Sequence, residues 1–150
     1  MKFICNGMLG KLCRLLRTCG IDTAYSNEGM AILLLARKEQ RVILTRNTQL
    51  KDKQNVLFLE LCEPREQLRN VIEHYQLHTD IHLFSRCIEC NTELKHVRKA
   101  SVKGKVPYFT YKNFQEFAQC PQCGRVYWKG SHYKNMLREI KDVLGQPTTE

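Results

Sequence analysis

The sequence has no apolar run that approaches the roughly 18 residues needed for a membrane-spanning helix. Its first residues also lack the basic and then apolar order of a secretory leader. Acidic side chains are scarce, because 15 Asp and Glu face 24 Lys and Arg, which gives a net charge of +9. From these absences we expect a cytoplasmic protein without a membrane partner, and an anionic partner such as nucleic acid.

A disulfide framework is also missing from the cysteine pattern, although the chain has 8 cysteines. Four stand singly among apolar residues, where a free cysteine behaves as a small hydrophobic side chain. These are Cys5, Cys13, Cys19 and Cys62. The other four form two C-x-x-C pairs, a spacing that is typical of a metal site in an intracellular chain. They are Cys87, Cys90, Cys120 and Cys123.

The chain up to about residue 84 alternates between short apolar runs and segments with helical spacing. Strands are predicted at 2–5, 23–25, 41–45 and 56–60, and helices at 8–19, 28–40 and 64–76. Gly20 follows the first helix as a C-terminal cap, and Pro64 opens the last one. Strands that alternate with helices imply βαβ units, so we predict an α/β domain with a small parallel sheet flanked by helices.

A zinc ribbon is predicted after residue 84. Two C-x-x-C knuckles suit a closed, tetrahedral and therefore structural Zn²⁺ site. The 29 residues between the knuckles exceed the roughly 15 to 20 of a compact ribbon. We therefore predict residues 93–119 as a hairpin excursion that carries the aromatic segment YFTYKNF. The predicted domains are 1–84, the ribbon at 85–136, and a C-terminal helix and tail at 137–150.

Polar residues end two of the predicted strands. Asn6 follows the first strand directly, and Arg46 and Asn47 follow the third. In a parallel sheet, ligands bind beyond the carboxyl ends of the strands, so these side chains are predicted to converge on one crevice. The alternative is that they are ordinary turn residues, because asparagine and glycine favour turns.

Five stretches occur in an order that a known family shares. They are NGMLGKLCRLLRTCGIDTAY, ARKEQRVILTRNTQL, PREQLRNVI, SRCIECNTEL and CPQCGRVYWKGSHYKNM. Over residues 2–136 the chain resembles the Mut-seven C-terminal ribonuclease domain, a PIN-like nuclease fold followed by a zinc ribbon. The string GRVYWKGSHY after a C-x-x-C pair makes the resemblance specific. It implies a small α/β nuclease domain whose acidic residues hold a divalent metal for phosphodiester hydrolysis.

The resemblance breaks at two positions that should be acidic. The family pattern places aspartate where this chain has Asn6 and again where it has Asn47. Asp22 matches an aspartate of the pattern, and Glu28 lies in its acidic region, so both are candidate catalytic residues. Mg²⁺ or Mn²⁺ in a nuclease is bound largely by carboxylates, whereas an asparagine amide has no formal charge. Two missing carboxylates should lower the affinity for metal steeply.

Three explanations of the asparagines stay open. The one that we favour is impaired or lost catalysis, with a crevice that no longer repels phosphate and holds RNA without cutting it. A second is that two aspartates were changed deliberately to trap substrate. In the third, Asp22, Glu28 and Asp52 rebuild a weaker site, and the protein is an active Mg²⁺- or Mn²⁺-dependent endoribonuclease.

A basic segment of the predicted ribbon, KHVRKASVKGKVPYFTYK, interleaves basic and aromatic residues. Lys103 and Lys105 can follow a phosphate backbone while Tyr108 stacks on a base, as in proteins that hold single strands. With Arg46 at the crevice, they are the candidate contacts to RNA, single-stranded or structured. One alternative is a solvated loop whose aromatic residues cover the ribbon. Another, outside nucleic acids, is a protein-interaction module stabilised by zinc.

Overall fold

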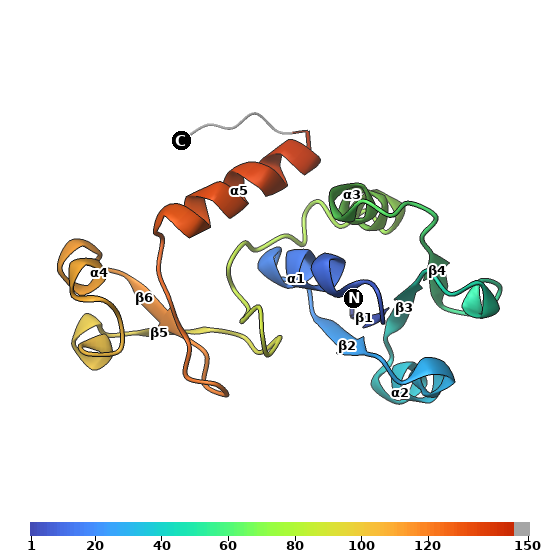
Figure 1. The fold of residues 1–150 in the computed structure, drawn as a ribbon, viewed down its shortest axis with the longest axis horizontal. Coiled ribbons are helices and arrows are strands. Elements are labelled where there is room, and N and C mark those ends of the chain that lie inside the picture. Colours follow the sequence, from blue (N-terminus) through green and yellow to red (C-terminus); the bar gives the residue numbers. More distant parts are fainter. Residues whose placement is uncertain (146–150) are drawn as a thin grey trace. The chain divides into compact units, whose positions relative to one another are not determined.

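The structure is a computed structural model that describes residues 1–145 of the chain. It divides into two compact units, Met1–Phe84 and the residues from Ser85 onward (Figure 1). The end of the tail predicted at 137–150 falls at residues 146–150, outside the described residues. Within residues 1–145, none of the helices combines the length and the apolar character needed to cross a membrane.

The first unit contains a four-stranded parallel sheet. Its strands are β1 (Phe3–Asn6), β2 (Thr23–Ser26), β3 (Val42–Thr45) and β4 (Val56–Phe58). Their order across the sheet is β2-β1-β3-β4. The central strands are apolar on both faces, as expected for a sheet covered on both sides. The prediction of an α/β domain with a parallel sheet is confirmed.

Helices cover both faces of this sheet (Figure 1). On one face, α2 (Ile32–Glu39) buries Ile32 and Ala36 in a cluster with sheet residues Ile4 and Ile43. On the other face, α1 (Gly10–Thr18) and α3 (Pro64–His74) pack against each other. Phe3, whose side chain alternates with that of Ile4, meets Tyr75 after α3 edge to face at 5.3 Å. The first unit therefore has three layers, with helices on both faces of the sheet and loops at the ends of the strands.

The helix boundaries follow local signals, with one difference from expectation. Gly20, with φ of 80°, follows α1, and Glu63 caps α3 by accepting a hydrogen bond from the Glu66 N–H at 3.0 Å. The helix predicted at 28–40 begins instead as a 3₁₀ turn, η1 (Gly29–Ala31), before α2. Gly29 has φ of 59°, which is incompatible with a right-handed helix, so α2 starts later than its apolar pattern suggested.

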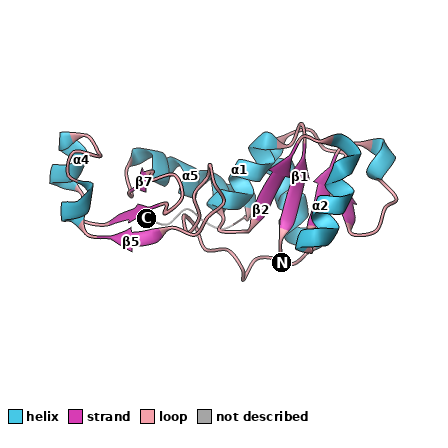
Figure 2. Ribbon diagram, turned by 90° about the horizontal axis from the view of Figure 1, so that it is seen from below, coloured by secondary structure: helices cyan, strands magenta, loops and turns pink. Residues whose placement is uncertain are grey.

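The second unit is built on an antiparallel sheet. Its strands are β5 (Lys95–Val97), β6 (Phe117–Gln119) and β7 (Val126–Tyr127), in the order β5-β6-β7. Between β5 and β6 the chain forms η3 (Lys99–Val102) and the short helix α4 (Tyr108–Asn113), which Figure 2 shows at the end of this strand pair. The segment YFTYKNF is thus largely helical. After β7, α5 (Ser131–Val143) begins inside the range predicted for the ribbon.

Candidate functional site

The carboxyl ends of the parallel strands bring polar residues to one edge of the sheet. Asn6, the last residue of β1, pairs in register with Ser26, the last residue of β2. Cys5 pairs with Leu44, so Thr45, the last residue of β3, lies beside Asn6 on its other side. We call this the carboxyl edge: the last residues of β1, β2 and β3 and the loop residues directly after them. The three strands deliver one amide and two hydroxyls to it.

Asn6 lies in a crowded corner of the carboxyl edge. Its side-chain nitrogen Nδ2 is buried and has no hydrogen-bond partner within the described residues. A buried unpaired donor costs about 1–3 kcal/mol. A Cβ at the next position, Gly7, would overlap Oδ1 of Asn27, so a side chain there would require the Asn27 side chain to move. The loops after β1 and β2 therefore lie close together beside the unpaired Asn6 amide.

Asn47 has a structural task at the same edge. Its Oδ1 accepts a hydrogen bond from the Gln49 N–H at 2.9 Å and caps the 3₁₀ turn η2 (Thr48–Leu50). Its own N–H donates to the Thr45 hydroxyl oxygen at 3.0 Å. Aspartate and asparagine are about equally good at such a cap. The fold therefore uses the oxygen of residue 47 whether or not that residue carries a charge.

Arg46 connects the carboxyl edge to the segment after β4. Its Nε donates to the Leu59 carbonyl at 3.2 Å, and its Nη2 donates to the Glu60 carbonyl at 3.1 Å. Arg46 is half-buried, and both of these acceptors are neutral backbone carbonyls. It therefore holds backbone and contributes positive potential to the edge.

The predicted catalytic carboxylates are not gathered at this edge. Asp22 precedes β2 and so lies at the opposite, amino end of the strands, where its carbonyl accepts the Phe3 N–H at 2.9 Å. Its carboxylate accepts a hydrogen bond from Arg41 Nη1 at 2.8 Å. Glu28 and Asp52 are exposed in the loops after β2 and β3. We therefore leave Asp22 out of the proposed site.

The carboxyl edge does not fit a hard cation. Across residues 1–145, the one group of three or more Cys, His, Asp or Glu able to share a metal is the set of four cysteines. Mg²⁺ and Mn²⁺ take oxygen ligands and need carboxylate charge to offset dehydration. The arrangement of Asp22, Glu28 and Asp52 gives no support to a rebuilt metal site.

Asp22 is expected to matter for stability. Arg41 is 12% exposed and Asp22 23% exposed, and bonds to Asp22 and Glu39 outweigh burial and raise the pKa of Arg41. Asp22→Asn keeps an oxygen acceptor but removes the negative charge that pairs with this guanidinium, so it should lower the free energy of unfolding by about 1–3 kcal/mol, measured by urea denaturation. The matched control is Glu39→Gln, because Glu39 is Arg41's other partner but is 45% exposed and should cost less than about 1 kcal/mol. Equal losses from both changes would contradict this assignment.

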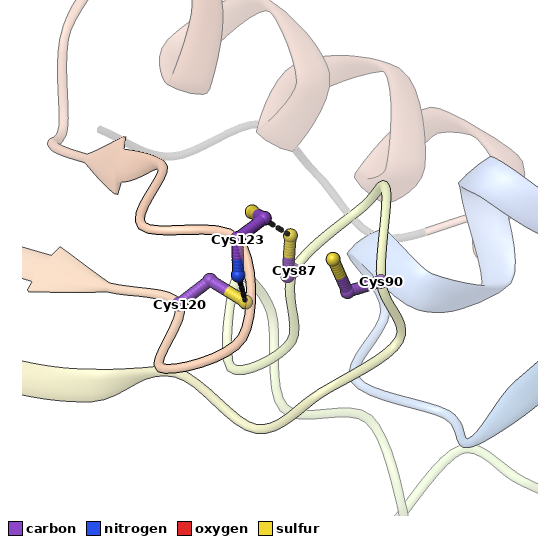
Figure 3. A group of neighbouring side chains, drawn as sticks. All are labelled: Cys87, Cys90, Cys120 and Cys123. Carbon is purple, nitrogen blue, oxygen red and sulfur yellow. Dashed lines mark hydrogen bonds between the residues drawn. The ribbon is translucent and has the colours of Figure 1, made fainter.

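The four predicted zinc ligands do come together (Figure 3). All four are free thiols, and their Sγ atoms lie within 4.8 Å of one another. The Sγ atoms of Cys87 and Cys123 are 3.7 Å apart. Sulfurs held about 2.3 Å from a tetrahedral zinc are about 3.8 Å apart, so this spacing matches a four-thiolate site. The cluster could hold a metal ion such as zinc.

The two knuckles share one backbone design. The Asn91 N–H donates to the Cys87 carbonyl at 2.8 Å, and the Gly124 N–H donates to the Cys120 carbonyl at 2.9 Å. Asn91 and Gly124 have φ of 65° and 80°, the left-handed conformation that asparagine and glycine adopt most readily. In each knuckle the backbone therefore turns back directly after the second cysteine, and both pairs of sulfurs face a common centre.

Tyr127 on β7 supports the cluster from outside. Its hydroxyl oxygen accepts the Ile88 N–H at 3.1 Å, which leaves the hydroxyl hydrogen for the Cys87 Sγ, also at 3.1 Å. Burial and the neighbouring Cys87 raise the pKa of Tyr127, so the hydroxyl stays protonated. Such donors orient metal ligands and stabilise thiolate charge. Sequence reasoning missed this role, although Tyr127 stands in the diagnostic string GRVYW.

The thiols of the cluster differ in acidity because four adjacent sulfurs resist ionising together. Burial and hydrogen bonds with the neighbouring cysteines raise the pKa of Cys90 to about 12. In Cys120, backbone N–H donors from Cys123 and Gln122 outweigh burial and lower the pKa to about 7. A divalent cation would favour the thiolate form at every position.

The other predicted nucleic-acid contacts occupy one stretch of the second unit. Lys103 and Lys105 flank a turn at Gly104, whose φ is 82°, and Tyr108 begins α4. All three side chains are exposed. Arg46 belongs to the first unit, so the stretch around α4 forms a separate candidate surface.

The chain thus combines a parallel α/β unit with a module that carries four clustered cysteines. The family model described as Mut7-C RNAse domain matches residues 1–140. The chain therefore belongs to the Mut7-C RNAse domain family, and the resemblance in its sequence is confirmed. No curated protein and no solved structure gives a significant match.

Proposed function

We propose that this chain is an RNA-binding member of the Mut7-C RNAse domain family that holds RNA without cutting it. The observation that carries this proposal is that the neutral residues Asn6, Ser26 and Thr45 end the strands and that no cluster of carboxylates forms within residues 1–145. Metal-dependent hydrolysis of a phosphodiester needs a cation that orients the attacking water and offsets transition-state charge. The residues present do not supply its ligands.

The same residues suit phosphate and sugar. Amide and hydroxyl side chains are common ligands of phosphate oxygens and ribose hydroxyls. Asn6, Ser26 and Thr45 themselves carry no negative charge that would repel a phosphate, and Arg46 adds a positive charge beside them. The net charge of +9 supplies the long-range attraction that RNA binding requires.

We assign the four cysteines to a structural Zn²⁺. Cys87, Cys90, Cys120 and Cys123 would complete a tetrahedron and leave no open coordination position for substrate. When bound, the metal would supply folding energy to the second unit and take no part in cleavage. The basic segment between β5 and β6 would then be presented by a rigid base.

Incubation with labelled RNA in the presence and absence of Mg²⁺ or Mn²⁺ tests the proposal. We expect a shifted RNA band in a native gel and intact RNA in a denaturing gel, with either metal and at neutral pH. Metal-dependent cleavage by fresh protein, abolished by both EDTA and Asn6→Ala, would establish the active endoribonuclease instead. Failure to bind any RNA at low salt would favour a protein-interaction module.

A further inference from the structure

We propose that α4 and the basic segment around it form a docking surface for unpaired RNA, with bases stacked on Tyr108 and Phe109 and phosphates held by neighbouring lysines. This inference rests on the proposed RNA-binding function and specifies the form of RNA and the contact residues. The surface consists of residues 94–115, and we call it the aromatic-basic surface. It lies wholly within the second unit.

The two aromatic side chains are displayed to solvent. Tyr108 is 76% exposed and Phe109 is 71% exposed, whereas Val102 and Thr110 on either side are buried. The short helix α4 is thus fixed through its other face while two large rings point outward. Burying such rings is favourable, so their exposure indicates a surface that meets a partner.

The backbone under these rings is held by several contacts. Lys99 on η3 places its Nζ 5.1 Å from the Tyr111 ring centroid and 3.3 Å from Oε1 of Gln115. The Tyr111 N–H donates to the Pro107 carbonyl at 3.0 Å, and Asn113 Nδ2 donates to the Phe109 carbonyl at 2.8 Å. These contacts tie η3 to α4, which lies at the end of β5 and β6 in Figure 2. A platform ordered in advance loses less entropy when RNA binds.

Charge identifies the occupant as an anion. The 22 residues from 94 to 115 contain six basic side chains and no Asp or Glu. The six are Lys95, Arg98, Lys99, Lys103, Lys105 and Lys112. Lys103 and Lys105 stand on the turn that leads to the exposed rings, so phosphates bound there would lie near bases on Tyr108 and Phe109.

The combination of rings and lysines favours unpaired over paired RNA. In a duplex the base faces are already stacked on each other, and the deep major groove of A-form RNA excludes side chains. In a single strand the faces are available, and a base on an aromatic ring contributes about 1–3 kcal/mol with little sequence preference. Acidic peptides would satisfy the lysines but offer no flat faces to the two exposed rings.

Fluorescence anisotropy with the full zinc-loaded chain tests this surface. The probes are an unstructured 12-nucleotide RNA, an RNA duplex of the same length, and a glutamate-rich peptide. For the single strand we expect Tyr108→Ala and Phe109→Ala each to raise Kd about five- to 150-fold. The matched control is Leu34→Ala, because Leu34 is 72% exposed on α2 in the other unit. It should leave Kd unchanged.

Salt dependence tests the lysines separately. Lys103→Gln with Lys105→Gln should reduce the slope of log affinity against log salt for the single strand by roughly one to two. The fold of every variant is checked by its zinc content and melting curve. Arg37→Gln with Lys38→Gln, an exposed pair in the last turn of α2 in the first unit, is the control for loss of two charges and should change the slope less.

The outcomes separate this inference from the proposed function. If the chain binds RNA but the aromatic variants match Leu34→Ala, or if the duplex binds as tightly as the single strand, the docking surface is refuted and the RNA-binding function stands. Tighter binding of the peptide than of RNA, with loss in the same variants, assigns the surface to an acidic protein and also refutes it. Binding of no probe RNA at low salt overturns both.

Discussion

Removal of metal from the four-cysteine cluster will unfold the second unit and leave the first unit folded. Purified protein should contain about one zinc per chain. Apparent binding free energies of structural zinc are about 10–16 kcal/mol at neutral pH, more than the stability of a small domain. Within residues 85–145 the sheet of the second unit has three short strands, so chelation should abolish protection of its amides in hydrogen exchange while the sheet of the first unit stays protected.

Single substitutions sharpen this prediction. Cys87→Ser should lose the metal and the fold of the second unit, whereas Cys62→Ser changes an exposed free cysteine of the first unit and should retain one zinc. Tyr127→Phe should keep the fold but weaken zinc binding about 10- to 100-fold in a chelator competition, because Cys87 loses its hydroxyl donor. The control for loss of a hydroxyl is Tyr25→Phe, because Tyr25 is an exposed tyrosine of the first unit. Zinc-free protein with an unaltered melting curve would contradict the structural role.

Restoring two carboxylates should convert the carboxyl edge into a metal site. The double change Asn6→Asp with Asn47→Asp adds two negative charges where the strands end. At position 6 it also removes a buried donor that has no partner within residues 1–145, and at position 47 it keeps the cap acceptor of η2. Addition of Mg²⁺ or Mn²⁺ should raise the melting temperature of this double variant, and it should not raise that of the original protein. We expect at least some metal-dependent cleavage of RNA.

Two controls accompany the double variant. The double change Asn55→Asp with Asn70→Asp adds the same charge to the first unit, because Asn55 directly precedes β4 and Asn70 lies on α3. This control should gain neither stabilisation by metal nor cleavage of RNA. The sequence Asn6-Gly7 is prone to deamidation, which would generate an acid spontaneously, so intact mass must be recorded on fresh and aged protein. A double variant whose melting temperature ignores both metals would show that the carboxyl edge cannot hold them even with the charge restored.

The sequence was informative wherever a pattern was local. Alternating apolar runs predicted the parallel sheet, and the two C-x-x-C pairs predicted the cysteine cluster, because both depend on spacing along the chain. The predicted start of the helix at residue 28 was less accurate, because the positive φ of Gly29 delays the start of α2. Local patterns fix which element forms, but backbone conformation at single residues decides where it begins.

The roles of several site residues depended on contacts that spacing along the chain does not encode. Asp22 matched the family pattern, yet its position before β2 places it at the amino end, where a partner 19 residues away along the chain, Arg41, binds it. Tyr127 reaches Cys87 across 40 residues, because β7 joins the sheet beside β6. The unpaired amide of Asn6 became visible only once its surroundings were packed. Such contacts are set by tertiary structure.

The cap at Asn47 has a consequence for the history of the chain. Because aspartate and asparagine serve this cap about equally well, an exchange between them passes without a penalty in folding. In the genetic code the two residues are separated by a single base at the first codon position. A negative charge at this position can therefore be lost by one point mutation that selection on stability does not oppose, and it can be regained by another.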